Sequence, residues 1–105
     1  MVRIEERKSP VWEEDLIMCP SQCYCYFESD GKRYCIYLRW RWDDPWVARV
    51  VPVDNKCDFT YNGDWELLET KCYSHDAYKK LESEAVRVIM KRFTRIKWLS
   101  QEYEE

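Results

Sequence analysis

Residues 23–42 read CYCYFESDGKRYCIYLRWRW, and they carry the clearest structural signal in the chain. Asp30-Gly31 lies between two alternating runs, which is a strong hairpin signal because a type I′ turn needs positive φ at both central residues. Pairing Ser29 with Lys32 sets the register of the two strands. The sequence therefore predicts an antiparallel hairpin over residues 23–42.

This register sorts the side chains onto two chemically different faces. The apolar face carries Cys23, Cys25, Phe27, Tyr34, Ile36, Leu38, Trp40 and Trp42. The opposite face, here called the Tyr/Arg face, carries Tyr24, Tyr26, Glu28, Arg33, Cys35, Tyr37, Arg39 and Arg41. Slipping the register by one residue would turn Arg39 and Arg41 toward the core, so burial selects the first alignment.

The segments around the hairpin are less distinctive. Residues 46–53 predict a third strand, which Pro52 either places at a sheet edge or ends, and residues 65–70 are a candidate for a fourth. Residues 54–64 read as a polar loop. Near the N-terminus, Ser9 and Pro10 favour a short helix over residues 10–18, with Val2 and Ile4 in a short edge strand as the alternative.

A long helix is expected after Ser74, which is a suitable N-cap. Apolar residues recur at helical spacing in Tyr78, Leu81, Ala85, Val88, Ile89, Phe93, Ile96 and Leu99. The predicted fold class is α+β: a three- or four-stranded antiparallel sheet (hairpin 23–42 plus strand 46–53) with one long C-terminal helix, about residues 75–99, on the apolar face. We expect one domain over residues 1–105, in which residues 1–9 and 100–105 are the segments prone to disorder.

Composition narrows the functional classes. The net charge is −3 over 105 residues, which argues against a general nucleic-acid-binding domain. No apolar run approaches the roughly 20 residues that span a bilayer, so no membrane partner is expected. The N-terminus lacks an apolar leader, which favours a cytoplasmic location. Abundant Lys, Glu and Arg with few amide side chains are typical of hyperthermophile proteins.

The six cysteines allow three interpretations. Cys23 and Cys25 fit as small buried hydrophobes, and a Cys57–Cys72 disulfide would anchor the polar loop. A zinc site would have to draw its ligands from Cys19, Cys23, Cys25, Cys57, Cys72 and His75. Because the chain has no Cys-x2-Cys pair, we expect no metal and no other cofactor.

One catalytic pairing is conceivable, between Cys72 and the single histidine, His75. A thiol near a helix N-terminus can have a lowered pKa, and Asp76 lies beside the histidine. The chain has only two glycines, so neither Walker nor Rossmann phosphate loops occur. We therefore expect no enzymatic activity.

Two surfaces are candidate binding sites. The Tyr/Arg face offers planar rings for bases and guanidinium groups for phosphates, unless it is an ordinary solvated face or is covered by the N-terminal segment or a second subunit. The helix presents a basic stripe that ends at an exposed Trp98, although such a stripe is often only a solvated face. The candidate binding residues are Tyr24, Tyr26, Arg33, Tyr37, Arg39, Arg41, Lys80, Arg87, Lys91 and Arg95.

These observations favour a small binding or adaptor domain without enzymatic activity. A protein is the expected partner, and its identity and the oligomeric state are left open. Single-stranded nucleic acid bound on the Tyr/Arg face is the alternative.

Overall fold

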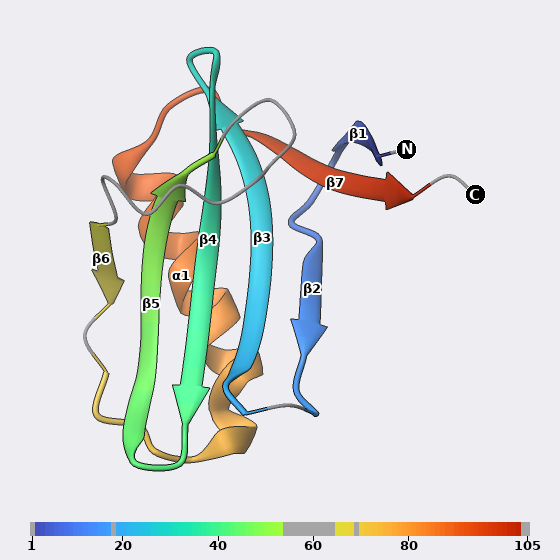
Figure 1. Cartoon of the computed structure of the whole chain (residues 1–105). Coiled ribbons are helices and arrows are strands. Elements are labelled where there is room, and N and C mark those ends of the chain that lie inside the picture. Colours follow the sequence, from blue (N-terminus) through green and yellow to red (C-terminus); the bar gives the residue numbers. More distant parts are fainter. Residues whose placement is uncertain (1, 18, 54–64, 69, 104–105) are drawn as a thin grey trace.

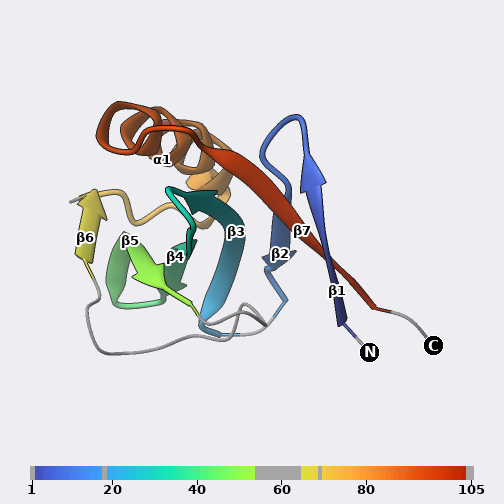
Figure 2. The same ribbon diagram turned by 90° about the horizontal axis from the view of Figure 1, so that it is seen from above.

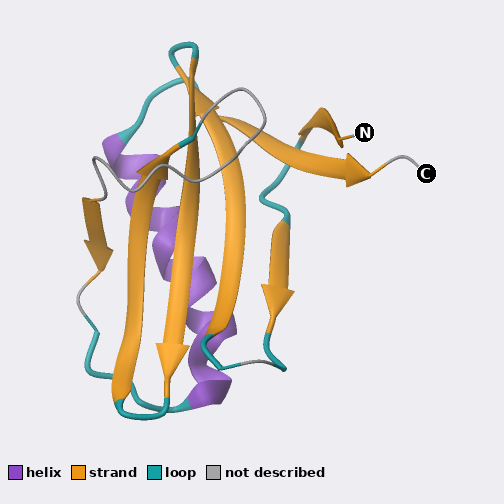
Figure 3. Cartoon of the chain, viewed as in Figure 1, coloured by secondary structure: helices purple, strands orange, loops and turns teal. Residues whose placement is uncertain are grey.

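The computed structural model describes residues 2–17, 19–53, 65–68 and 70–103. Within these residues seven antiparallel strands form one sheet, and a 3₁₀ turn leads into one α-helix (Figure 1, Figure 3). The strands are β1 (Val2–Arg7), β2 (Trp12–Asp15), β3 (Ser21–Ser29), β4 (Lys32–Arg41), β5 (Asp44–Pro52), β6 (Trp65–Leu68) and β7 (Lys97–Tyr103). The helical elements are η1 (His75–Ala77) and α1 (Tyr78–Arg92).

The predicted hairpin is confirmed in β3 and β4. Ser29 pairs with Lys32 and Cys25 with Ile36, in the register that burial selects. Asp30 has a φ of 50° and Gly31 a φ of 80°, as a type I′ turn requires. The two faces of the hairpin are therefore the two that the sequence pattern predicts.

The other strands extend the sheet on both sides of this hairpin. Their order is β1-β7-β3-β4-β5-β6, and β2 also pairs with β3. The outer edge of β3 is shared, because β2 pairs with its residues 22–25 and β7 with its residues 26–28. β1 pairs with β7, and the two strands run away from the rest of the sheet as a ribbon that carries both termini (Figure 2).

Helix α1 covers only one face of the sheet, the apolar one (Figure 2). Its buried apolar residues are Leu81, Ala85 and Ile89, and they join the hairpin's apolar face in the main core. The fully buried members of that core include Phe27, Ile36, Leu38, Cys23 and Cys25. No helix in the described part of the chain is long and apolar enough to cross a membrane.

The predicted architecture is wrong in its strand number and in the length of its helix. The helical segment ends at Arg92, not near residue 99, because Phe93 is extended (φ −118°, ψ 148°) and Arg95 has a φ of 52°. The hairpin turn holds this break, since Ser29 Oγ donates to the Thr94 carbonyl oxygen at 2.6 Å.

The residues after the break form β7, whose apolar spacing resembles a helical pattern over this short stretch. Trp98 was expected to be exposed at a helix end. It is instead 8% exposed and packs against Phe27, with ring centroids 5.9 Å apart.

The predicted helix over residues 10–18 is also wrong. Residues 12–15 form β2, and each of them pairs with a residue of β3 in an antiparallel ladder. Trp12 and Glu14 lie opposite Cys25 and Cys23, on the face covered by α1. Glu14 lies on the same face as Trp12, so apolar and polar residues do not alternate along β2. The hydrophobic pattern of residues 12–15 therefore does not indicate a strand. The alternative for Val2 and Ile4, a short edge strand, is confirmed by β1.

Ile89→Ala should lower the free energy of unfolding by about 2–5 kcal/mol, because Ile89 is fully buried and the smaller side chain leaves a cavity. Met90→Ala is the matched control on the same helix. Met90 is 62% exposed, so its loss should change stability by less than about 0.5 kcal/mol. Urea unfolding followed by circular dichroism measures both, and equal effects would contradict the packing of α1 described here.

Candidate functional site

The connection from β6 to α1 crosses the end of the sheet and is held there by two tryptophans. Trp40 Nε1–H donates to the Tyr73 carbonyl oxygen at 2.9 Å, and Trp46 Nε1–H donates to the Ser74 carbonyl oxygen at 2.8 Å. The backbone N–H of Trp46 also donates to the Cys72 carbonyl oxygen at 2.9 Å. Because a buried indole N–H needs an acceptor, these bonds fix the path of the chain into η1.

An aromatic pocket opens beside this connection. Its volume is about 510 Å³, and it is lined by Leu16, Ile17, Cys19, Ser21, Trp40, Trp42, Tyr73 and His75. Three of these residues extend into solvent: Ile17 is 96% exposed, Trp42 76% and Tyr73 59%. Among the described residues, the other exposed large hydrophobic side chains are Val11 and Met90. Exposed apolar surface is thus concentrated at this pocket.

Trp42 differs from its predicted environment. The hairpin register places it on the apolar face, and its ring meets the buried Trp40 ring edge to face, with centroids 5.0 Å apart. It nevertheless lies in solvent, because it follows the last residue of β4 and no described element covers that end of the face. The pocket is therefore the end of the apolar face that the helix leaves open.

His75 forms the polar wall of the pocket. Its Nε2 lies 2.9 Å from Ser21 Oγ, and its Nδ1 lies 3.8 Å from an Asp76 carboxylate oxygen. Ser21 Oγ also donates to the Leu16 carbonyl oxygen at 3.3 Å. Ser21 is only 1% exposed, so this serine and histidine fasten the chain between β2 and β3 to η1 and do not present a nucleophile.

The predicted Cys72–His75 pairing is not formed, since within the described residues His75 bonds to Ser21. No disulfide joins two of the cysteines that the structure describes. The favoured Cys57–Cys72 disulfide involves Cys57, which lies outside the described residues.

Only one cysteine of the predicted zinc set joins a group of metal-ligating side chains in the described part of the chain. That group is Glu14, Cys23 and Glu82. Both carboxylates were missed by the sequence analysis. The signal for Glu82 was its position inside the apolar arc of the helix, between Tyr78 and Ala85.

Burial changes the protonation of this group. Burial, with the neighbouring Glu14 carboxyl, raises the pKa of Glu82 to about 8. Burial, with the negative charges of Glu82 and Glu14, raises the pKa of the Cys23 thiol to about 12. Both groups are therefore largely protonated at neutral pH when no metal ion is bound.

The Tyr/Arg face is partly covered. Tyr26 is 6% exposed and packs with Cys35 and Leu99 in a second small core, which Ile4 of β1 flanks. The sequence analysis gives covering of the Tyr/Arg face by the N-terminal segment as one possibility. Ile4 of β1 covers part of that face. The rings of Tyr24 and Tyr37 remain together beside this core, with centroids 5.5 Å apart, and burial raises the pKa of Tyr24 to about 12.

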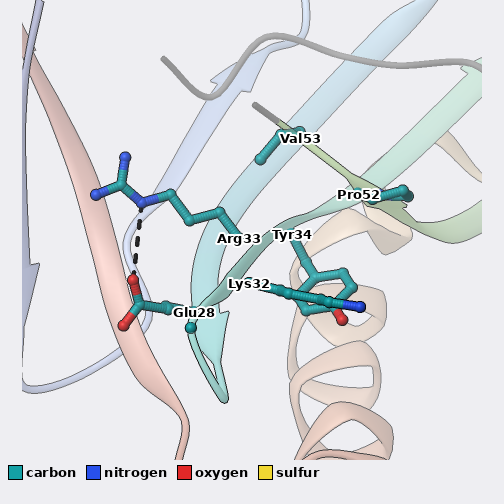
Figure 4. Close-up of a pocket in the computed structure, with 7 residues that line it drawn as sticks. Glu28, Lys32, Arg33, Tyr34, Pro52 and Val53 are labelled. Atoms are coloured by element: carbon teal, nitrogen blue, oxygen red, sulfur yellow. Dashed lines mark ion pairs between the residues drawn. The ribbon is translucent and has the colours of Figure 1, made fainter. Parts of the chain in front are cut away.

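The basic residues of this face fall into two groups. Arg33 is engaged at the turn end of the hairpin, where its Nε lies 3.8 Å from a Glu28 carboxylate oxygen. Figure 4 shows this ion pair on one side of β4, with Lys32 and Tyr34 on the other side. All four residues line a hollow of about 530 Å³. Arg49 of β5 lies opposite Tyr37 and so joins this face. Arg39, Arg41 and Arg49 form no ion pair with any other described residue.

The predicted basic stripe is shorter than expected. Lys80, Arg87 and Lys91 are exposed on α1. Arg95 lies beyond the helix, and its Nε is 3.6 Å from an Asp30 carboxylate oxygen. The stripe therefore consists of three residues and does not include Arg95.

Ser21→Ala should lower the free energy of unfolding by about 1–3 kcal/mol, because it removes the partner of His75 and of the Leu16 carbonyl in a buried site. Ser83→Ala is the control, since Ser83 Oγ bonds a helix carbonyl at an exposed position. Its effect should stay below about 0.5 kcal/mol. Urea unfolding of both variants provides the measurement, and a Ser21→Ala protein as stable as the control would contradict this role of the serine.

Comparison of the chain with protein-family models, with curated proteins and with solved structures finds no match. Function must therefore be inferred from the surfaces described above.

Proposed function

We propose that this protein is a binding module without enzymatic activity, and that its aromatic pocket receives an apolar side chain of a partner protein. The observation that carries the proposal is the exposure of Ile17, Trp42 and Tyr73 around one pocket. Contiguous exposed apolar surface commonly marks an interaction site. Trp and Tyr are also the residues that most often dominate the binding energy of protein interfaces.

The lining of the pocket favours an uncharged occupant. Among the residues that the structure describes, no Lys, Arg, Asp or Glu lines it. A phosphate or carboxylate placed there would lose its hydration without gaining an opposite charge. The volume of about 510 Å³ lies in the range of small-ligand pockets and accommodates one large side chain with its flanking backbone.

The surroundings of the pocket favour a protein over a free small molecule. Ile17 is almost fully exposed, so the apolar surface continues beyond the pocket itself. A protein segment covers such a margin, whereas a small ligand held in the pocket leaves it in water. The pocket would then hold the anchoring side chain, and Ile17 would lie under the rest of the segment.

The test is a selection of random peptides displayed on phage against the full chain. The enriched peptides should share an aromatic or aliphatic anchor. They should bind the Trp42→Ala variant at least about tenfold more weakly than the wild type, which corresponds to about 1.4 kcal/mol. Calorimetry or fluorescence anisotropy with synthetic peptides measures the ratio.

Met90→Ala is the matched control, because Met90 is an exposed apolar residue on α1 outside the pocket. Peptides should bind this variant as they bind the wild type. The proposal is wrong if no peptide is enriched, or if the enriched peptides bind the Trp42→Ala variant with unchanged affinity.

Single-stranded nucleic acid bound on the Tyr/Arg face is a second candidate. It is supported by Arg39, Arg41 and Arg49, which lack ion-pair partners in the described part of the chain, and by the adjacent pair of tyrosine rings. Guanidinium groups beside aromatic rings suit phosphates next to stacked bases. The partial cover over Tyr26 leaves less of this face for bases than the sequence pattern predicts.

Arg39→Glu combined with Arg41→Glu should abolish binding of labelled single-stranded oligonucleotides at low salt, because two cationic contacts become repulsive. Lys80→Glu combined with Lys91→Glu makes the same charge change on the helix and should retain binding. Filter retention measures both. An absence of salt-dependent binding by the wild type, or equal loss in the two double variants, removes this candidate.

A further inference from the structure

Three elements bring one thiol and two carboxyl groups together beneath α1. Glu14 of β2 and Cys23 of β3 are cross-strand partners on the apolar face, and Glu82 approaches from the helix. One ligand atom from each lies within 4.8 Å of the other two. Cys23 is fully buried and Glu82 is 4% exposed, whereas Glu14 is exposed, so this group lies at the margin of the folded interior.

One oxygen in this group has no partner. Glu82 Oε2 is buried and accepts no hydrogen bond from any described residue. Such an oxygen is costly because it has lost its water without a replacement. Lys79 does not reach it: the ammonium lies 3.1 Å from Glu14 Oε2 and 3.7 Å from Glu82 Oε1, on a side chain that is 67% exposed. A bound cation would supply the partner that this buried oxygen lacks.

We propose that Glu14, Cys23 and Glu82 bind a divalent transition-metal ion, with Zn²⁺ as the best fit. A thiolate among the ligands disfavours Mg²⁺ and Ca²⁺, which take oxygen ligands. Zinc accepts sulfur and carboxylate oxygen together. The thiolate and two carboxylates give three negative charges against the two positive charges of the ion, and the Lys79 ammonium balances the remainder.

The geometry is close to what a zinc ion requires. Zn–S bonds of about 2.3 Å and Zn–O bonds of about 2.1 Å in a tetrahedron set ligand atoms about 3.5 Å apart. Atoms now within 4.8 Å need to approach by about 1.3 Å at most, which rotation of the two glutamate side chains supplies. Cys23 can stay in place on β3.

A route to the ion and a fourth ligand position also exist. A hollow of about 420 Å³ is lined by Pro10, Trp12, Lys79, Glu82, Ser83 and Val86. It reaches Glu82 from solvent, past Lys79. With three protein ligands, the fourth position would face this hollow and be filled by water, as in zinc sites that keep an open position.

The test is a titration of the full chain, stripped with a chelator, with Co²⁺ as a spectroscopic substitute for Zn²⁺. One equivalent should produce thiolate-to-Co²⁺ charge-transfer absorption, and Zn²⁺ should then abolish it. Zn²⁺ should also raise the melting temperature, because an ion that binds the folded state stabilises it. These readouts do not depend on any partner, so they distinguish this proposal from the binding function above.

Glu82→Gln keeps the shape of the side chain and should weaken Co²⁺ binding at least about tenfold, and Cys23→Ser should abolish the charge-transfer band. Glu84→Gln and Cys19→Ser are the matched controls, on the same helix and at an exposed thiol, and should behave like the wild type. Circular dichroism checks that each variant is folded, and Glu82→Gln alone decides the matter if Cys23→Ser does not fold.

The proposal is overturned by folded wild-type protein that gives no charge-transfer band. It is also overturned if Glu82→Gln binds Co²⁺ as tightly as the wild type, or if Cys19→Ser loses the band, because the metal would then bind at other groups.

Discussion

Positive φ angles at Asp30 and Gly31 hold β3 and β4 in one register, and every other element is positioned by the two faces that this register creates. One face is continuous apolar surface from Phe27 to Trp40. It has to be covered, and α1 covers it. The residues beside this turn also contact the chain just after α1. Ser29 Oγ donates a hydrogen bond to the Thr94 carbonyl oxygen, where the chain has left helical geometry.

The shared edge of β3 accounts for much of what distinguishes this sheet. β2 and β7 each pair with only part of that edge, so each forms a short ladder with β3. Beyond these ladders the two strands lie in different parts of the molecule. β7 carries β1 and places Leu99 and Ile4 over part of the Tyr/Arg face. β2 places Glu14 beside Cys23, where the Lys79 ammonium of α1 lies 3.1 Å from the Glu14 carboxylate.

The aromatic pocket arises from a mismatch between the helix and the surface it covers. The apolar face continues to Trp42, whereas the chain enters η1 at a point fixed by the indole groups of Trp40 and Trp46. Packing accounts for the buried tryptophans. It does not account for Trp42, Tyr73 and Ile17, which remain in water in the described structure. That excess of exposed apolar surface is why we propose a binding function for this end of the molecule.

The hairpin, its turn, its register and the start of the helix near residue 75 can be predicted from the local pattern, because each depends on neighbours within a few residues. Long-range packing makes residues 97–103 a strand, pairs residues 12–15 with β3, and leaves Trp42 exposed while Tyr26 is covered. The candidate sites follow the same division. Trp42 and Cys23 could be placed on the apolar face from alternation alone. Trp42 lines a pocket with His75, which lies 33 residues further along the chain, and Cys23 lies near Glu82, which lies 59 residues further along. No local periodicity encodes which distant edge or face a segment will find.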